Sequence, residues 1–418
     1  MRRTLTNVSL LDRLPRPGDK RLAVRVTPDA LRHVRAGHPW LFDNSLTSVS
    51  HDGAPGDLAV VFDQDRRFAA VGLWDPNSPM RVKVLHHGKP VTVDRAFWAA
   101  RLEAAAARRQ PLVDRGDTTG HRVVNGENDS MPGLVLDRYD RTLVIKLYTA
   151  AWIPHLTDLV AVIDDLFRPD ALVLRLARNI PADALHGLEE GDALIGICPP
   201  DPVQFLENGL TFEADVVHGQ KTGHFLDQRD NRAYLRTLTD GASVLDLFAC
   251  TGGFTVYAAA GGAASVTAVD LSEPTLAAAA RNLGHNRQLP AVAGCKYTPV
   301  VNDAFREMDR LVHRATKFDI VVIDPPSFAQ RQFEAPRALG AYAKLTDLGV
   351  RLVQPGGLLV QCSCSSRVTA DEFYATVARS ASRAGRPLDE LRRTGHAVDH
   401  PVTFTEGAYL KAVFAVVP

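Results

Sequence analysis

The residues SVLDLFACTGGF, at positions 243–254, decide the fold. An apolar run with the length of a buried strand, 243–248, leads into a pair of glycines, and a helical stretch follows at 253–260. Glycine lets the backbone of such a turn come close to a ligand where a Cβ atom would collide. We therefore expect a strand, a glycine-rich turn and a helix that together hold a cofactor.

Strands and helices alternate around this stretch from about residue 206 to the end of the chain. Further strands are expected at 266–270, 318–324 and 358–362, and a final apolar strand at 410–417 is expected to close the sheet edge. Helical segments are expected at 273–284, 303–314, 337–353 and 370–384. This alternation predicts a parallel, doubly wound sheet, so the fold class is α/β with a Rossmann-like domain over 206–418.

Two smaller units are expected before residue 206. A basic tail over 1–20 precedes a small β-rich domain over 21–93, with strands at 22–26, 57–62 and 81–85 and a helix near 28–35. A connector helix at 94–109 then leads into a central α+β module. The module extends to residue 205, with strands at 134–136, 143–147 and 171–176 and a helix at 154–167. It offers no catalytic constellation.

Charge is distributed unevenly along a chain with 48 basic and 48 acidic residues. Residues 1–110 hold 18 Lys and Arg against 11 Asp and Glu, whereas residues 111–210 hold 8 against 16. A basic N-terminal segment suits a polyanionic partner such as nucleic acid. The five cysteines lack zinc-type spacing and the first 20 residues lack an apolar core, which predicts a cytoplasmic protein without a metal.

One uncharged stretch, residues 247–269, is long enough to span a bilayer. Two glycine pairs, Gly252-Gly253 and Gly261-Gly262, divide it into strand, turn, helix and strand lengths, and acidic residues flank it. The sequence therefore predicts no membrane span.

Acidic residues follow successive strands of the predicted sheet. Asp246 lies at the end of the first strand, Asp270 ends the next, and Asp303 follows the third. A carboxylate at the position of Asp270 can accept hydrogen bonds from both ribose hydroxyls, and Asp303 can take an adenine amino group. The dinucleotide fingerprint and the phosphate-binding Gly-Lys-Ser/Thr loop are both absent, which disfavours a pyrophosphate cofactor.

This set resembles the class I S-adenosylmethionine-dependent methyltransferases, in which these positions contact the methionine end, the ribose and the adenine. Other stretches resemble the bacterial large-subunit (23S) ribosomal RNA cytosine-5 methyltransferases: GHPW at 37–40, NGENDSMPGL at 125–134, GQKTGHFLDQR at 219–229, DPPSF at 324–328, SCS at 363–365, and DHPV at 399–402 with EG at 406–407. The resemblance implies a PUA-like domain over 21–93, a mostly parallel seven-stranded sheet, S-adenosylmethionine as cofactor and RNA as partner. It leaves a homodimer open.

The resemblance also implies a set of cofactor contacts from the glycine-rich turn, the strand ends and the loop before the first strand. These residues are Lys221, Thr222, Asp227, Arg229, Asp246, Phe248, Thr251, Gly252, Gly253, Phe254, Asp270, Leu271, Asp303, Ala304, Asp324 and Pro325.

Cys364 and Asp324 are the expected catalytic residues. Carbon 5 of cytosine is a poor nucleophile, and enzymes of this type activate it by adding a cysteine thiolate to carbon 6. Cys364 ends a strand beside the strand that delivers Asp324, so both should reach one rim of the sheet. Asp324 would bond the cytosine edge, and Pro326 and Phe328 would contact the flipped base. Ser327 stands where many RNA cytosine-5 methyltransferases have a second cysteine, so the proton-abstracting base is unassigned.

Two alternatives remain open. A guanine N-methyltransferase would use the Asp-Pro-Pro loop to orient an exocyclic amine and would need no cysteine. A catalytically silent RNA-binding factor for ribosome assembly would keep the fold without the reaction, although the intact acidic residues and glycines argue against it.

Overall fold

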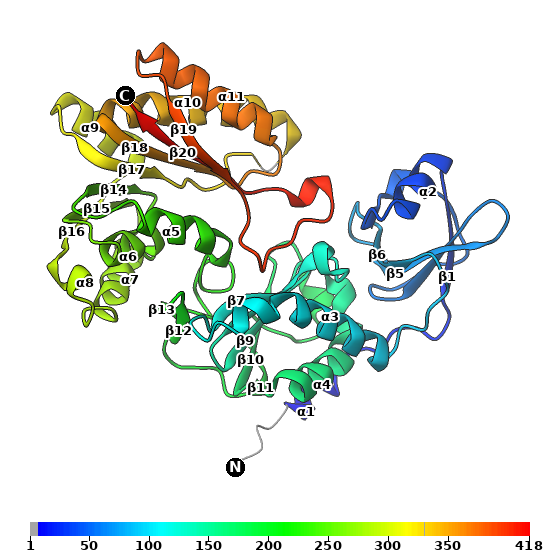
Figure 1. Ribbon diagram of the computed structural model, residues 1–418. Coiled ribbons are helices and arrows are strands. Elements are labelled where there is room, and N and C mark those ends of the chain that lie inside the picture. The colour runs from blue at the N-terminus through cyan, green and yellow to red at the C-terminus, as the bar shows by residue number, and fades with distance from the viewer. Residues whose placement is uncertain (1–6, 330) are drawn as a thin grey trace. The chain divides into compact units, whose positions relative to one another are not determined.

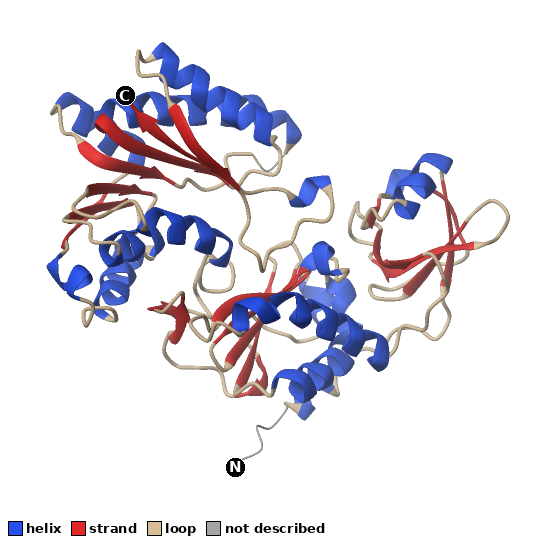
Figure 2. Ribbon diagram, viewed as in Figure 1, coloured by secondary structure: helices blue, strands red, loops and turns tan. Residues whose placement is uncertain are grey.

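The computed structural model describes residues 7–329 and 331–418, and the chain divides into two compact units. The first unit contains the chain up to Phe205 together with Ala214–His224 and Asp399–Phe404. The second unit contains Leu206–Glu213, Phe225–Val398 and Thr405–Pro418. The segments 214–224 and 399–404 thus group with the first unit, although the expected catalytic domain spans 206–418. Figures 1 and 2 show the elements of each unit.

A six-stranded sheet forms the N-terminal part of the first unit. Its order is β2 (Trp40–Leu41), β6 (Val82–His87), β5 (Phe68–Trp74), β4 (Leu58–Phe62), β1 (Leu22–Val26) and β3 (Leu46–Val49). Helix α2 (Pro28–Arg35) starts where the hydroxyl of Thr27 accepts a hydrogen bond from the Ala30 amide at 3.3 Å, with proline at its first position. The expected strands and helix are present, and β2, β3 and β5 are additional.

The segment expected as a basic tail also contains folded structure. Helix α1 (Val8–Leu11) lies within it, and Leu11 and Leu14 are buried in the same apolar cluster as residues of the central module. Their burial gives Leu11 and Leu14 a packing role that a count of basic residues does not predict.

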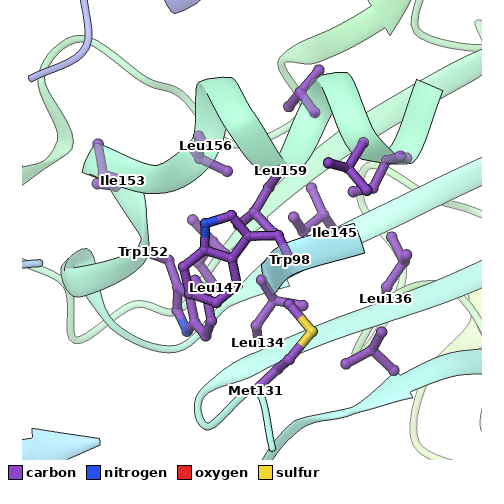
Figure 3. Close-up of a cluster of buried hydrophobic side chains, with 14 of the residues drawn as sticks. Trp98, Met131, Leu134, Leu136, Ile145, Leu147, Trp152, Ile153, Leu156 and Leu159 are labelled. Atoms are coloured by element: carbon purple, nitrogen blue, oxygen red, sulfur yellow. The ribbon is translucent and has the colours of Figure 1, made fainter. Parts of the chain in front are cut away.

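The central module contains a five-stranded sheet in the order β11 (Ala193–Gly196), β10 (Ala171–Leu176), β9 (Thr142–Leu147), β8 (Leu134–Tyr139) and β7 (Gly120–Asn125). Helices α3 (Arg95–Val113) and α4 (Leu156–Phe167) pack on it. Trp98 and Trp152 meet edge to face at 5.3 Å among Met131 and buried leucines (Figure 3). Strands β12 (Val203–Glu207) and β13 (Leu210–Ala214) form a separate two-stranded sheet.

The second unit is built on a seven-stranded sheet. Its order is β16 (Lys296–Val301), β15 (Ser265–Asp270), β14 (Ser243–Leu247), β17 (Phe318–Ile323), β18 (Val353–Ser363), β20 (Lys411–Val417) and β19 (Asp389–Thr394). The first five strands are parallel, and β20 pairs antiparallel with both of its neighbours. The mostly parallel seven-stranded sheet predicted from the sequence is confirmed.

Helices cover both faces of this sheet (Figure 1). They are α5 (Arg229–Arg236), α6 (Gly253–Ala260), α7 (Glu273–Gly284), α8 (Pro290–Gly294), α9 (Ala304–His313), α10 (Ala335–Leu352) and α11 (Ala370–Arg383). Leu247 of β14 packs with Met308 of α9 and Leu345 of α10. Val244, of opposite parity in the same strand, packs with Ala258 of α6. Alternate residues of each strand therefore enter different cores, as the pleat of a strand requires.

The expectation that residues 410–417 close the sheet edge is wrong. Strand β20 lies between β18 and β19, and β19 forms the edge. The sequence of β20 is apolar and almost wholly buried, whereas β19, Asp389–Thr394, is charged and exposed. Charged side chains on an edge strand discourage pairing with another chain, which is a physical reason for this order.

None of the helices formed by residues 7–329 and 331–418 combines the length and the apolarity needed to cross a bilayer.

Candidate active site

The site forms where the parallel strands β14, β15, β17 and β18 end at the same edge of the sheet. The turn after β14 has a left-handed backbone at alternate residues: φ is 62° at Phe248, 48° at Cys250 and 78° at Gly252. This conformation is strained for residues other than glycine, and such strain gathers at functional sites. A Cβ atom on Gly252 would lie 2.7 Å from the Cβ of Ala279. Glycine at this position therefore allows the left-handed backbone of the turn, and it also leaves room for α6 to lie close to α7.

Two carboxylates lie beside this turn. Asp246 is buried, and its Oδ2 accepts a hydrogen bond from the Thr255 hydroxyl at 2.6 Å, while its Oδ1 has no partner among the described residues. Asp270 accepts from the amides of Cys250 at 2.9 Å and Ser272 at 3.0 Å. In the described parts of the chain, neither carboxylate forms an ion pair with a basic side chain. These two carboxylates thus present negative charge with no basic side chain of the described residues paired to them.

The electrostatics of Asp246 favour a cationic ligand. Burial raises the pKa of Asp246 to about 7, against the lowering effect of the Thr255 hydrogen bond, and the charges of Asp324 and Asp270 add to the rise. S-adenosylmethionine carries an ammonium and a sulfonium group, so it fits a site with an unpartnered buried carboxylate oxygen. Leu271, directly after Asp270, is 71% exposed and leaves an apolar side chain at the surface.

Cys364 and the Asp324 loop meet at this edge. The Sγ of Cys364 donates a hydrogen bond to the carbonyl oxygen of Pro325 at 3.7 Å, and the Asp324 amide donates to the carbonyl oxygen of Leu247 at 3.4 Å. Cys364 directly follows β18 and is half-buried, whereas Cys362 within β18 is fully buried, and burial raises the pKa of the Cys362 thiol well above its ordinary value. Of these two thiols, only that of Cys364 is partly exposed.

Asp324 is held by a chain of amide and hydroxyl groups. The Nε2 of Gln228 donates to the carboxylate of Asp324 at 2.8 Å, and the Oε1 of Gln228 accepts from Asn231 at 2.6 Å. The hydroxyl of Thr394 in turn donates to Asn231 at 2.5 Å. Sequence reasoning gave these three side chains no role, because nothing in the sequence links Gln228 to an aspartate 96 residues away.

Four residues expected at the cofactor are engaged in other contacts. Thr222 belongs to the first unit, where its hydroxyl donates to Asp137 at 2.6 Å, and the Lys221 carbonyl there accepts from Lys146 at 3.0 Å. Within the second unit, Asp227 accepts from the hydroxyl of Tyr409 at 2.8 Å. Arg229 is buried, with its Nε 3.4 Å from Asp230.

The remaining expected contacts differ in where their side chains lie. Phe254 and Ala304 are buried in the two helix–sheet cores. Asp303 caps α9 by accepting from the Arg306 amide at 3.0 Å. The carbonyl of Thr251 accepts from Asn282 at 2.9 Å, and Gly253 begins α6. The structure therefore gathers the acidic residues and the turn, and uses several neighbours for packing.

In the loop expected to contact the base, one side chain is packed against neighbours and others are exposed. The ring of Phe328 packs 5.2 Å from Tyr342 and 6.4 Å from Phe305, so its faces already have aromatic neighbours. Pro326 and Ser327 are exposed. Across the described residues, no three His, Cys, Asp or Glu side chains are grouped as a metal site.

Comparisons with known proteins agree with this geometry. Residues 190–392 match the sequence model of a S-adenosylmethionine-dependent methyltransferase, and residues 24–87 match that of a PUA-like domain. The chain is 46% identical to a ribosomal RNA large subunit methyltransferase of Deinococcus radiodurans, over 96% of this chain and 98% of the relative. It is 34% identical to ribosomal RNA large subunit methyltransferase I of Alteromonas mediterranea, over 93% of this chain and 97% of the relative.

Solved structures share the fold. The methyltransferase SMU.776, complexed with S-adenosylhomocysteine, superposes with a TM-score of 0.80 at 22% identity, over 95% of this chain and 100% of that chain. A S-adenosylmethionine-dependent methyltransferase from Streptococcus mutans gives a TM-score of 0.79, also at 22% identity, over 94% of this chain and 100% of that chain.

Proposed function

Because the chain belongs to the family of S-adenosylmethionine-dependent ribosomal RNA large subunit methyltransferases, we propose that it methylates carbon 5 of a cytosine in 23S ribosomal RNA. The observation that carries this proposal is the hydrogen bond from the Cys364 thiol to the Pro325 carbonyl at 3.7 Å. This hydrogen bond supports the assignment of Cys364 as a nucleophile that lies next to Asp324, at the edge of the sheet where the ligand would bind. A guanine N-methyltransferase would have no use for a half-buried thiol at this point.

Cys364 and Asp324 divide the reaction between them. The Cys364 thiolate forms a bond to carbon 6 of the cytosine, and Asp324 holds the amino and ring-nitrogen edge of the base, where in its protonated form it stabilises the charge that develops on the ring. When bound, S-adenosylmethionine supplies the methyl group as an electrophile for carbon 5. Carbon 5 then loses its proton to a base, the carbon 6–sulfur bond breaks, and the electron pair returns to Cys364.

The cofactor would lie along the turn and the acidic strand ends. In this proposal Asp246 faces the ammonium group, Asp270 binds the ribose and Leu271 and Asp303 adjoin the adenine. The contacts expected from Lys221, Thr222, Asp227 and Arg229 have less support, because their side chains or backbone are engaged in other hydrogen bonds and ion pairs.

The basic N-terminal part of the first unit would bind RNA phosphates, as the match of residues 24–87 to a PUA-like domain suggests. We place the enzyme in the cytoplasm, where ribosomal RNA is its substrate. A homodimer stays a prediction that sedimentation of the chain would test.

The experiment is methylation of deproteinised 23S ribosomal RNA with methyl-labelled cofactor, followed by nucleoside analysis. We expect the label in 5-methylcytidine. Label in a methylguanosine would overturn the cytosine assignment in favour of the amine reaction. A flat calorimetric titration with S-adenosylhomocysteine, together with no transfer, would favour the silent assembly factor.

We also expect cofactor binding to depend on pH through Asp246. Its pKa of about 7 leaves the free carboxyl mostly protonated at pH 6, and an ammonium group binds the ionised form. The affinity for S-adenosylhomocysteine should therefore rise about tenfold from pH 6 to pH 8, with release of a proton on binding below pH 7.

Calorimetry in buffers of different ionisation enthalpy measures that proton. Asp246→Asn should bind S-adenosylhomocysteine more weakly. In this variant the affinity should no longer change with pH, and binding should release no proton. If the affinity depended on pH equally in the wild type and in Asp246→Asn, a group other than Asp246 would be responsible for the titration.

A further inference from the structure

A buried lysine lies next to the proposed nucleophile. Lys411 begins β20 and pairs with Ser363 of β18, the residue directly before Cys364. Its exposed fraction is only 3%. Val413 and Ala415, two and four residues further along β20, pack in the apolar cluster with α10 and α11. Because side chains alternate along a strand, Lys411 lies on this same covered face of the sheet.

The ammonium group of Lys411 binds the backbone that follows Cys364. Its Nζ donates to the carbonyl oxygens of Ser365 at 2.5 Å and Val368 at 2.7 Å. Within residues 7–329 and 331–418, no carboxylate lies within ion-pair distance of this group. A buried charge that is bound only by carbonyl groups is costly, so a structural role alone would be served better by a neutral side chain.

The charges around this lysine point to the thiol. Burial lowers the pKa of Lys411 to about 8. The negative charges of Cys364 and, to a lesser extent, Glu372 act in the opposite direction and raise this pKa. The other titratable groups around Cys364 are Asp324 after β17, Tyr342 on α10 and Cys362 on β18. All of these carry negative charge or none, and one further basic residue, Arg367, lies on the loop after Cys364.

We propose that Lys411 is a positioning residue for Cys364, whose buried ammonium ion stabilises the thiolate and fixes the Ser365–Val368 loop behind it. The proposal rests on the proposed function, since it concerns the nucleophile of that reaction. Electrostatic coupling is reciprocal, so a thiolate that favours the charged lysine is itself favoured by that lysine.

The test measures the thiol directly and needs no turnover. The rate of alkylation of Cys364 by iodoacetamide is followed from pH 5.5 to 9.5, with the modified site assigned by mass spectrometry. In the wild type, we expect the midpoint below the ordinary thiol pKa of about 8.5. Lys411→Met should raise the midpoint by about one pH unit and slow alkylation at pH 7 about tenfold. The difference should shrink above pH 8, where Lys411 loses its proton.

Two further variants separate charge from loop anchoring. Lys411→Gln keeps a donor for the carbonyl groups without the charge, and should behave like Lys411→Met. Lys411→Arg keeps the charge and should recover most of the reactivity. A wild-type profile in Lys411→Gln would overturn the proposal.

The wild-type profile decides the matter if the neutral variants fail to fold. A midpoint at or above 8.5 in the wild-type enzyme then contradicts the proposal, and a lower one supports it. Failure of the proposed function is seen separately, as the absence of 5-methylcytidine from the product of the wild-type enzyme.

Discussion

Cys364→Ser is expected to lower methyl transfer to cytosine by about 10³-fold or more, because a serine hydroxyl does not add to carbon 6 at neutral pH. The structure supports this size of effect, since Cys364 is half-buried and hydrogen-bonded to the loop that carries Asp324. The loss should appear in a single turnover with labelled cofactor. The affinity for S-adenosylhomocysteine should change little, because the proposed cofactor contacts follow other strands of the sheet.

Cys362→Ala is the matched control. It removes a sulfur two residues before Cys364, within β18, where Cys362 is buried in the core with α5 and α6. A small cavity should cost about 1–2 kcal/mol of stability and leave transfer within about tenfold of the wild type. A Cys364→Ser enzyme that still methylates RNA would contradict the covalent mechanism and favour amine methylation.

The central strands and the acidic site could be predicted because their signals are local. Apolar runs with a glycine-rich break mark β14 and α6, and parallel topology then brings Asp246, Asp270 and Asp324 to one edge. Two of the strands that were not expected lack that signal, because four of the six residues of β19 are charged and β2 has only two residues. Their place is set by pairing with neighbours.

The supporting residues of the site could not be predicted, because they depend on contacts between distant positions. Gln228 reaches Asp324 only once the loop before α5 folds against the sheet. Lys411 reads as the polar first residue of an apolar strand. The loop 219–229 carries the family resemblance. Two of the cofactor contacts expected from it form other hydrogen bonds, however: Thr222 donates to Asp137, and Asp227 accepts from Tyr409.

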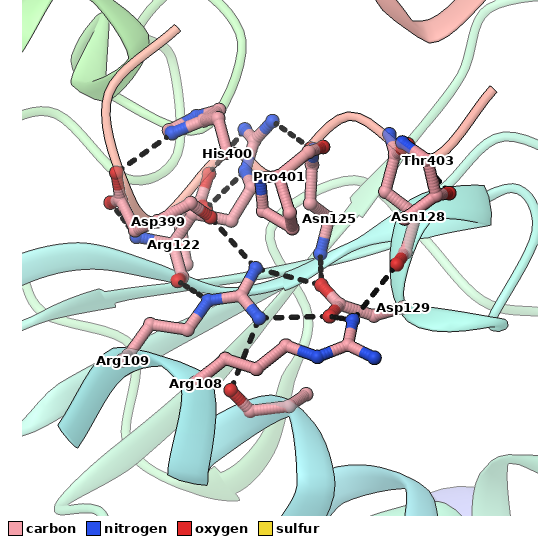
Figure 4. Close-up of polar contacts among 12 residues, drawn as sticks. Arg108, Arg109, Arg122, Asn125, Asn128, Asp129, Asp399, His400, Pro401 and Thr403 are labelled. Carbon is pink, nitrogen blue, oxygen red and sulfur yellow. Dashed lines mark hydrogen bonds and ion pairs between the residues drawn. The ribbon is translucent and has the colours of Figure 1, made fainter.

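Two other stretches that carried the resemblance meet in the first unit (Figure 4). The carboxylate of Asp399 accepts from the Arg122 amide at 2.8 Å, and the Asn125 side chain donates to the Pro401 carbonyl at 3.1 Å. Asn128 accepts from the Thr403 amide at 2.8 Å. These contacts give the NGENDS and DHPV sequences a structural role, and explain why 399–404 groups with a unit remote in sequence.

Arg109→Met should be the most destabilising change in this network. Arg109 is buried at 1% exposure and binds both carboxylate oxygens of Asp129, at 2.8 and 2.7 Å. It also donates to the carbonyls of Asp399 at 2.7 Å and Arg122 at 3.0 Å. Its removal leaves a buried carboxylate and unpaired carbonyl groups, which should lower the free energy of unfolding of the first unit by about 3–5 kcal/mol.

Arg108→Met provides the comparison, because Arg108 binds the same carboxylate from the surface. Its side chain is 51% exposed and lies 2.8 Å from Asp129. Solvent screens this pair, so its loss should cost no more than about 1 kcal/mol. Urea unfolding followed by tryptophan fluorescence reports on the first unit through the buried Trp98 and Trp152. Equal decreases in the free energy of unfolding in the two variants would contradict this prediction. They would mean that Arg108 compensates for Arg109 at Asp129, and that burial does not determine the strength of these contacts.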